Sequence, residues 1–319
     1  MKVVREYGPN NIKNSSLCFG TMQFGDGASE RDSQEMYEAC RENGINFFDT
    51  AYVYTGGKSE IILGDLIKNE REKIILITKA GSVGGSSGKN IRSQLEESLK
   101  RLKQDYVDIF FLHHWDDNIP LEETFDTLQE LKEEKKFYQL GVSNFSSWQV
   151  MKAEMLAKNH SYLSVDILQP MYNLVKRQAE VEILPMAKSE NIGVISYSPL
   201  GGGLLTGKYS VDNSTTKNSS GRLHDNAKYK KRYGQNWMYD AAISLQDLAK
   251  ELNYNPISLA VAWVNYHEAI TAPIISARNL KQLIPSLESE NISLDDETYK
   301  LISNISPTPP PATDRLEEA

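Results

Sequence analysis

The stretch FFDTAYVYTGG, residues 47–57, predicts both the fold of this chain and the chemistry it carries. Its apolar start, Phe47 and Phe48, is typical of a buried strand that ends at Asp49. Five residues later Tyr54 comes just before a pair of glycines, which is typical of a turn. The stretch therefore places a carboxylate and a phenol close together at the end of a strand.

Two further apolar runs end in polar residues. The run IILITKA delivers Lys79, and the run VDIFFLHHWD delivers His113 and His114. The carboxyl ends of neighbouring parallel strands meet at one edge of a sheet, so we expect these side chains to lie beside Asp49 and Tyr54. An acid, a phenol, an amine and an imidazole at one edge form a set of groups that can handle protons.

The rest of the chain repeats an apolar run followed by an amphipathic stretch. We expect strands within residues 17–25, 46–51, 74–80, 107–114, 138–145, 165–173, 193–200 and 272–277. We expect helices at residues 29–43, where Gly44 ends the helix, and at 59–68, 91–101, 121–135, 147–158 and 179–190. Two more should follow Ala241, the second beginning at Pro256. This alternation predicts an α/β fold with a parallel sheet covered by helices.

Closure of the sheet into a (β/α)₈ TIM barrel, with a short N-terminal hairpin at one end, is the predicted fold. The alternative is an open doubly wound sheet, which usually has an early glycine-rich turn that we do not find near the N-terminus. We expect residues 1–306 to form a single domain. The proline-rich and then charged residues 307–319 should be a disordered C-terminal tail.

A long polar segment after the seventh strand, residues 201–236, interrupts the regular pattern. It contains a cluster of basic residues, namely Lys228, Lys230, Lys231 and Arg232. One hypothesis is a flap that closes over a phosphate-bearing ligand, and the alternative is a solvated loop. Within it, GGLLTGKY resembles a P-loop, but Tyr209 stands where a P-loop has Ser or Thr to bind magnesium, so we reject that function.

Composition argues against several classes of protein. The 43 acidic and 35 basic residues give a formal net charge of −8, which disfavours a nucleic-acid partner. The N-terminus MKVVREYG is not apolar, and no apolar run approaches the roughly 18 residues that span a bilayer, so we expect no membrane association and a cytoplasmic location. Cys18 and Cys40 match neither a disulfide framework nor a metal site, so no metal is expected.

Tyr54 needs help from its neighbours to transfer a proton, because the unperturbed pKa of a phenol is about 10. An ammonium beside it, such as Lys79, lowers that pKa, and Asp49 would hold the ammonium in place. A histidine would orient a carbonyl group, but both faces of its strand are buried, so the pattern does not choose between His113 and His114. The alternative is a structural Asp49–Lys79 ion pair with Tyr54 as an ordinary loop aromatic.

The motifs of this chain resemble, in order and over nearly its whole length, those of the aldo-keto reductase family. They are FGTMQFG, FFDTAYVYTGG, ITKAG, SLKRLKQDYVDIFFLHHWD, ELKEEKKFYQLGVSNF, LQPMYN, ISYSPLGGGLLTGKY and PIISARNLKQL. The resemblance implies a catalytic tetrad of Asp49, Tyr54, Lys79 and His113, in which the spacing from Asp108 places the histidine. His114 then stands where the family often has tryptophan or arginine.

The resemblance further implies a nicotinamide coenzyme, NADPH with NADH as the alternative, that lies extended across the barrel mouth. The residues that the resemblance assigns to coenzyme binding are Thr21; Ser143, Asn144 and Gln169 at the carboxamide; Tyr197 on the nicotinamide ring; Ser198, Leu200, Gly202 and Leu204 at the pyrophosphate; and Ser276, Arg278 and Gln282 at the adenosine end. The choice of NADPH rests on Arg278, because a guanidinium suits a 2′-phosphate. The alternatives are that Ser143 and Asn144 cap a helix, that Gln169 is a buried amide and that Arg278 only begins a helix.

The function implied by the resemblance is NADPH-dependent reduction of aldehyde and ketone carbonyls of small molecules to alcohols. Tyr54 would be the general acid, Lys79 with Asp49 would lower its pKa, and His113 would position the carbonyl oxygen. One alternative is a Schiff-base aldolase that uses Lys79 as nucleophile. Another is a coenzyme-binding regulatory protein, because the resemblance extends to potassium-channel β-subunits.

Overall fold

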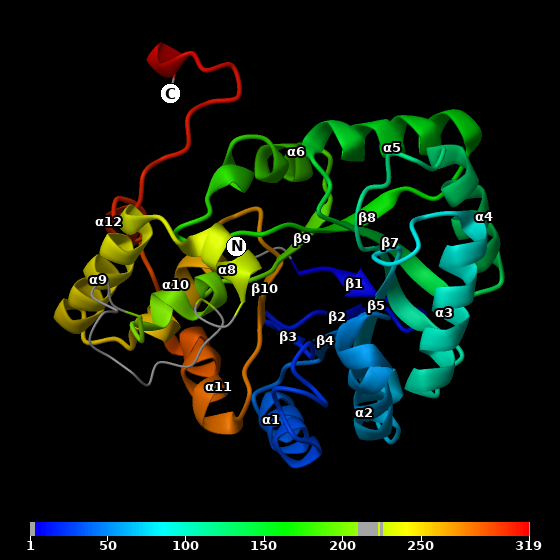
Figure 1. Ribbon diagram of the computed structural model, residues 1–319, viewed down its shortest axis with the longest axis horizontal. Coiled ribbons are helices and arrows are strands. Elements are labelled where there is room, and N and C mark those ends of the chain that lie inside the picture. The colour runs from blue at the N-terminus through cyan, green and yellow to red at the C-terminus, as the bar shows by residue number, and fades with distance from the viewer. Residues whose placement is uncertain (1–3, 210–222, 224–225, 319) are drawn as a thin grey trace.

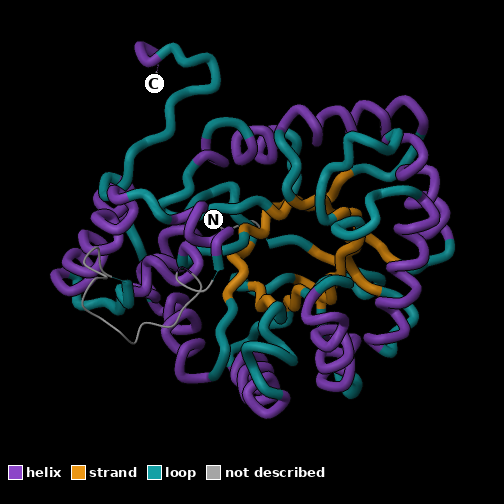
Figure 2. The backbone as a smooth tube through the Cα atoms, in the orientation of Figure 1, coloured by secondary structure: helices purple, strands orange, loops and turns teal. Residues whose placement is uncertain are grey.

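The computed structural model describes residues 4–209, 223 and 226–318. Within these residues, eight strands form a closed barrel in which every neighbouring pair runs parallel (Figure 1, Figure 2). They are β3 (Cys18–Gly20), β4 (Phe47–Asp49), β5 (Ile75–Ala80), β6 (Val107–Leu112), β7 (Phe137–Ser143), β8 (Val165–Gln169), β9 (Gly193–Ser196) and β10 (Ala272–Ile275). The barrel closes because β10 pairs with both β9 and β3, which confirms the predicted (β/α)₈ fold and excludes an open sheet.

Helices form a layer around the outside of the strands, as the tube in Figure 2 shows. The α-helices are α1 (Glu30–Glu42), α2 (Lys58–Ile67), α3 (Gly88–Leu102), α4 (Leu121–Glu133), α5 (Ser147–His160), α6 (Ile183–Ser189), α8 (Ala227–Tyr233), α9 (Asn236–Glu251), α10 (Pro256–Tyr266), α11 (Leu280–Leu287) and α12 (Asp296–Ser303). The 3₁₀ turns are η1 (Tyr54–Gly57), η2 (Arg71–Lys73), η3 (Gln178–Glu180), η4 (Gly201–Thr206), η5 (Glu288–Asn291) and η6 (Leu316–Glu318). None of the helices in the described part of the chain is long and apolar enough to cross a membrane.

The predicted helix boundaries hold where a cap or a proline marks them. Gly44 follows the end of α1 with φ of +75°, and Pro256 begins α10 as expected. The helix expected at residues 179–190 is instead the short turn η3 followed by α6. The helix α8, and the helices α11 and α12 after β10, are not among the predicted helices.

The segment at residues 201–236 begins and ends in regular structure. It starts with η4 and finishes with α8, so the long polar segment is bounded by regular structure. Residues 210–222 and 224–225 of the hypothetical flap lie outside the described residues. The basic cluster divides, because Lys228, Lys230 and Lys231 are exposed whereas Arg232 is half-buried.

Side chains fill the interior of the barrel on the amino-terminal side of the carboxyl strand ends. Its inner cluster includes Phe47 and Phe111, both fully buried, and Gly141 of β7 leaves room for the Phe111 ring. The hairpin of β1 (Glu6–Tyr7) and β2 (Ile12–Lys13) adds Tyr7, whose ring centroid lies 5.5 Å from that of Phe47. This packing leaves the other end of the barrel for a site.

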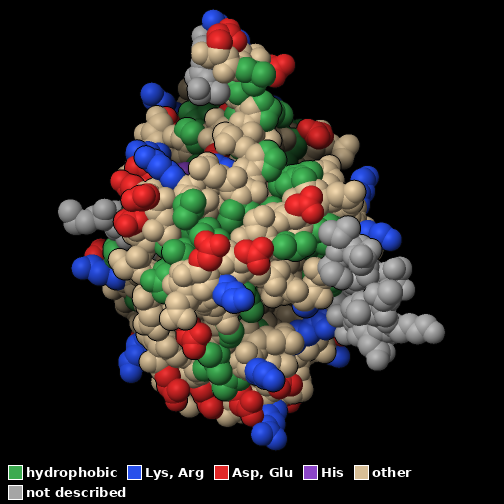
Figure 3. All heavy atoms as spheres, turned by 90° about the vertical axis from the view of Figure 1, so that its left-hand side faces the viewer, with side chains coloured by type: hydrophobic (Ala, Val, Ile, Leu, Met, Phe, Trp, Pro, Cys, Tyr) green, Lys and Arg blue, Asp and Glu red, His purple; other side chains and the backbone are tan. Residues whose placement is uncertain are grey.

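The outside of the molecule carries charges of both signs. On the face seen in Figure 3, acidic and basic side chains are interspersed among hydrophobic ones. Beyond residue 306 the chain leaves the barrel as an extended strip that ends at η6 (Figure 1), and most of its side chains are exposed. That residues 307–319 lie outside the folded domain stays a prediction.

Candidate active site

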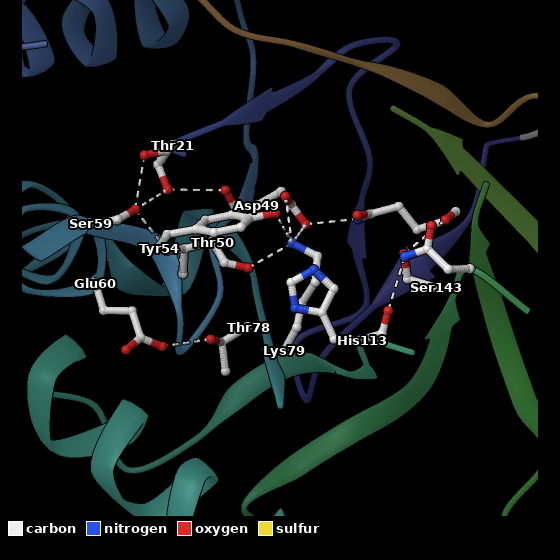
Figure 4. Close-up of polar contacts among 12 residues, drawn as sticks. Thr21, Asp49, Thr50, Tyr54, Ser59, Glu60, Thr78, Lys79, His113 and Ser143 are labelled. Atoms are coloured by element: carbon white, nitrogen blue, oxygen red, sulfur yellow. Dashed lines mark hydrogen bonds and ion pairs between the residues drawn. The ribbon is translucent and has the colours of Figure 1, made fainter. Parts of the chain in front are cut away.

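The barrel brings together an aspartate and a lysine from neighbouring strands (Figure 4). Asp49 ends β4 and Lys79 is the last residue but one of β5, and both side chains are buried. Lys79 Nζ lies 2.6 Å from Asp49 Oδ1 and 2.7 Å from Asp49 Oδ2. Burial acts to lower the pKa of Lys79, but the carboxylate and the nearby Tyr54 outweigh it and raise that pKa above its ordinary value. The ammonium is therefore charged.

The same ammonium is bonded to Tyr54. Lys79 Nζ donates to the Tyr54 hydroxyl at 3.2 Å and to the Thr50 carbonyl at 2.7 Å, so the ion pair is not an isolated structural pair. Burial raises the pKa of Tyr54, and Lys79 opposes the rise without reversing it. Lys79 thus lowers the pKa of Tyr54 as expected, but phenolate desolvation outweighs the attraction of the ammonium and the net shift is upward. Tyr54 is protonated at neutral pH, as a proton donor must be.

The turn that holds Tyr54 is fixed on both sides. Before it, the Tyr52 N–H donates to the Lys79 carbonyl at 3.0 Å, so the chain stays bonded to β5 beyond the end of β4. Within it, Gly57 has φ of +94°, and a Cβ there would lie 2.7 Å from Arg101 Cζ. Only glycine fits that backbone without strain, so the second glycine of the pair noted in the sequence is a requirement of this turn.

His113 follows β6 and faces Tyr54. The two rings meet edge to face at 6.0 Å between centroids, and His114 stacks on His113 at 4.9 Å. Burial, the Lys79 ammonium and His114 lower the pKa of His113 to about 3. Its Nδ1 is buried and has no hydrogen-bond partner among the described residues. A neutral imidazole with unused hydrogen-bonding capacity therefore lies beside the phenol, which favours His113 over the more exposed His114.

A second set of polar side chains comes from β7, β8 and the end of β9. Gln169 Nε2 donates to Asp49 Oδ1 at 2.8 Å, and Ser143 Oγ donates to the Gln169 carbonyl at 2.9 Å. Asn144 Nδ2 donates to Ser143 Oγ at 3.1 Å, and the Tyr197 hydroxyl donates to Asn144 Oδ1 at 2.7 Å. The predicted carboxamide residues thus form one chain of contacts that begins at Asp49.

The alternative that Ser143 and Asn144 cap a helix is wrong. The N-cap of α5 is Ser146, which forms a capping box with Gln149. Asn144 instead adopts φ of +59°, and Ser198 across the mouth adopts φ of +61°. Non-glycine residues in this backbone region are uncommon and concentrate at functional sites.

A cavity of about 780 Å³ opens at this end of the barrel. The predicted residues that line it are Asp49, Tyr54, His113, Ser143, Asn144, Gln169, Tyr197, Ser198, Leu200, Gly202, Ser276, Arg278 and Gln282. Lys79, Thr21 and Leu204 are fully buried behind its wall. Thr21 Oγ1 lies against the Asp49 carbonyl and Ser59, so its side chain supports the strand ends rather than facing the cavity.

The outer part of the cavity is basic although the chain as a whole is acidic. Lys208, Arg232, Arg278 and Lys281 line it, and Asp49, at the end near Tyr54, is the acidic residue among the described lining. Neither Lys208 nor Lys281 is among the predicted site residues, although both lie in motifs that carry the resemblance, ISYSPLGGGLLTGKY and PIISARNLKQL. The signal for Lys208 was present, because a glycine-rich turn followed by a basic residue is typical of a loop that binds phosphate.

Comparison with known sequences decides the family. Residues 16–307 match the profile of the aldo/keto reductase family. This chain belongs to that family. It is 33% identical over 320 residues to the uncharacterized oxidoreductase YrpG of Bacillus subtilis (strain 168), a match that covers 95% of each chain. As an aldo-keto reductase, the protein is an NAD(P)H-dependent oxidoreductase that acts on CH–OH and C=O groups.

Two other relatives of this aldo-keto reductase have more specific names. Aflatoxin B1 aldehyde reductase member 2 of Rattus norvegicus is 35% identical over 286 residues, which cover 84% of this chain and 78% of the relative. A probable voltage-gated potassium channel subunit beta of Oryza sativa subsp. japonica is 30% identical over 302 residues, covering 90% and 91%. Relatives of this reductase therefore include both a named reductase and a protein named as a channel subunit.

The lining fits a nicotinamide dinucleotide. The cavity volume lies in the range of ligand pockets, and its four basic groups suit a coenzyme that carries phosphates. At the predicted adenosine end, Ser276 Oγ is buried without a partner in the described part of the chain. At the predicted pyrophosphate position, Gly202 has φ of +67° and a Cβ there would lie 2.7 Å from the Tyr229 ring, so the bare backbone faces the cavity.

Proposed function

We propose that this aldo-keto reductase reduces the carbonyl group of aldehydes and ketones to an alcohol with NADPH, and that Tyr54 is its general acid. The single observation that carries the proposal is the contact between the Tyr54 hydroxyl and the Lys79 ammonium, 3.2 Å apart at the end of a cavity that also holds His113. The name of the rat relative favours aldehydes as substrates.

The proposed steps use the charge states set by the site. When bound in this cavity, the coenzyme would supply a hydride to the carbonyl carbon. The Tyr54 O–H donates its proton to the carbonyl oxygen, and the Lys79 ammonium stabilises the phenolate that remains. Neutral His113 donates a hydrogen bond to the same oxygen and orients it. Asp49 holds Lys79 charged and in place.

Tyr54→Phe tests the assignment of the acid. This variant keeps the ring and removes the proton, so turnover of a panel of carbonyl compounds should fall by roughly 10² to 10⁴-fold. The assay follows loss of reduced-nicotinamide absorbance. The affinity for NADPH, measured by quenching of protein fluorescence, should change by less than about threefold, because Tyr54 is not among the predicted coenzyme contacts. Full turnover in the variant would contradict the proposal.

The preference for NADPH rests on Arg278 in the basic part of the cavity. A guanidinium can form two parallel hydrogen bonds to the 2′-phosphate that NADH lacks. Arg278→Met should therefore weaken NADPH binding by roughly tenfold or more, while NADH binding changes little. Equal losses for both coenzymes, or a native preference for NADH, would refute the choice of coenzyme.

The aldolase alternative is disfavoured by the surroundings of Lys79. A Schiff-base lysine must present a neutral amine to the substrate. Lys79 instead has a raised pKa, is fully buried and donates to Asp49, Thr50 and Tyr54.

The regulatory alternative predicts NADPH binding with no turnover of any carbonyl compound, so the same panel of carbonyl compounds decides between it and the reductase. The buried, unpaired Cys18 and Cys40 fit the proposed cytoplasmic location.

A further inference from the structure

Each member of the Asp49–Lys79 pair has a strand neighbour that faces away from the cavity. Thr50 follows Asp49 and Thr78 precedes Lys79, and successive side chains of a strand point to opposite sides. Both threonine side chains are fully buried on the outer side of the barrel wall, where α2 packs. The position of each threonine is thus tied to the position of its catalytic neighbour.

Two consecutive residues in the first turn of α2 bind these threonines (Figure 4). Ser59 Oγ lies 2.9 Å from Thr50 Oγ1, and Glu60 Oε1 accepts a hydrogen bond from Thr78 Oγ1 at 2.6 Å. Ser59 and Glu60 are both fully buried. One helix start therefore holds the ends of the two strands that carry the ion pair.

Ser59 also connects the strand end to the turn that holds Tyr54. Its Oγ lies 2.7 Å from Thr21 Oγ1, so three buried hydroxyls form one cluster. The Ser59 N–H donates to Thr55 Oγ1 at 2.9 Å, and Thr55 directly follows Tyr54. Loss of the Ser59 hydroxyl would free the Thr50 segment, whose carbonyl accepts a hydrogen bond from Lys79 Nζ.

Glu60 reaches the same segment from the other side. Its Oε2 lies 3.2 Å from Arg101 Nη1, and that nitrogen donates to the Tyr52 carbonyl at 2.9 Å. The Arg101 guanidinium also lies over the Tyr52 ring, 4.5 Å from its centroid. Glu60 therefore links β5, through Thr78, to the chain that leads into the Tyr54 turn.

We propose that Ser59 and Glu60 are positioning residues, which fix the distance between the Lys79 ammonium and the Tyr54 hydroxyl and so set the rate of proton transfer. This inference rests on the proposed function of Tyr54. Neither residue belongs to the cavity lining described above, so they act only through Thr50, Thr78 and the turn. Displacement of a reacting group by about 1 Å can reduce a rate by roughly 10²-fold.

Two variants remove the two links, and two others serve as controls. Ser59→Ala removes the hydroxyl cluster, and Thr78→Val removes the hydrogen bond to Glu60 while keeping the side-chain shape. Thr78→Ser keeps the hydroxyl and should restore most of the loss. Ser98→Ala removes another buried serine hydroxyl, on α3, which has no partner within the described residues and should leave the rate unchanged.

The expected result is a loss of rate without a loss of coenzyme affinity. In Ser59→Ala and Thr78→Val, kcat per folded molecule should fall by roughly tenfold or more, while the dissociation constant for NADPH changes by less than about threefold. Thermal unfolding gives the folded fraction, so a variant that is only less stable is recognised. If Ser59→Ala and Thr78→Val turned over substrate as fast as Ser98→Ala at equal folded fraction, the inference would be overturned.

A second measurement does not depend on turnover. With ¹³Cζ-labelled tyrosine, the Tyr54 resonance at pH 7 is identified by its absence in Tyr54→Phe. It should move in Ser59→Ala and Thr78→Val and stay in place in Ser98→Ala, because its position reports the contact with the ammonium. An unmoved resonance in both variants would refute the inference. Failure of the wild-type protein to reduce any carbonyl would refute the proposed function alone, since the resonance still tests the positioning.

Discussion

At the scale of single residues, burial decides which groups in the site carry charge. Lys79 keeps its charge because Asp49 lies 2.6 Å away. At Tyr54 the ammonium only partly offsets burial, and at His113 the ammonium and His114 act in the same direction as burial, so both groups are shifted toward their neutral forms. The site therefore combines one charged pair with a neutral phenol and a neutral imidazole, which are the forms that donate hydrogen bonds to a carbonyl oxygen.

The lowered pKa of His113 predicts a pH-dependent loss of stability. The unfolded chain binds a proton at His113 near pH 6.5, whereas the folded chain does so only near pH 3. Between these values the unfolded state holds more protons, so stability falls as pH falls. From pH 7 to pH 5 the wild type should lose about 1 to 2 kcal/mol more free energy of unfolding than His113→Asn.

Urea unfolding at the two pH values measures this difference. His160→Asn, at an exposed position at the end of α5, is the matched control and should follow the wild type. If His113→Asn loses as much stability as the wild type between pH 7 and pH 5, the imidazole of His113 is not held neutral by the fold.

At the scale of elements, β6 and β7 place a large and a small residue opposite each other inside the barrel. Phe111 of β6 lies opposite Gly141 of β7, and a Cβ at position 141 would lie 2.4 Å from Phe111 Cζ. Where the barrel is this tightly packed, two residues that face each other on neighbouring strands cannot both have large side chains. The glycine in GVSNF thus serves the packing of a neighbouring strand that lies about thirty residues earlier.

Gly141→Ala should destabilise the protein by about 1 to 3 kcal/mol, because the added methyl group forces the Phe111 ring out of its position. Chemical unfolding followed by circular dichroism measures the change. The double variant Phe111→Leu, Gly141→Ala should be less destabilised than the sum of the two single variants, since the smaller side chain makes room. Additive effects of the two substitutions would show that the two residues do not compete for space.

At the scale of the whole molecule, the folded unit is expected to end near residue 306. Ser306 is buried, and its carbonyl lies 3.4 Å from Arg177 Nη1, but the residues beyond it extend away from the barrel. Ending the chain after Pro307 should leave both the unfolding midpoint and carbonyl turnover unchanged, because few buried contacts are removed. A clearly lower midpoint by calorimetry would show that the tail belongs to the domain.

Charge is also distributed at the scale of the molecule. The net charge of −8 describes the chain as a whole, which is acidic. The cavity has the opposite character, because Lys208, Arg232, Arg278 and Lys281 come together there. These four residues extend from Lys208 to Lys281 in the sequence, so their proximity depends on the closure of the barrel between β9 and β10. A sum over the sequence cannot reveal such a local field.

The sequence by itself determined the repeating strands and helices, the glycine turn after Asp49 and the order of polar residues at the strand ends. These features are local, because hydrophobic period and turn chemistry depend on neighbours in the chain. The tertiary structure alone decided that Thr21 and Leu204 lie behind the cavity wall, that the ring of His113 meets Tyr54 edge to face, and that the pKa of Tyr54 is raised. Burial and distance decide such properties, and both arise from residues that meet only when the barrel closes.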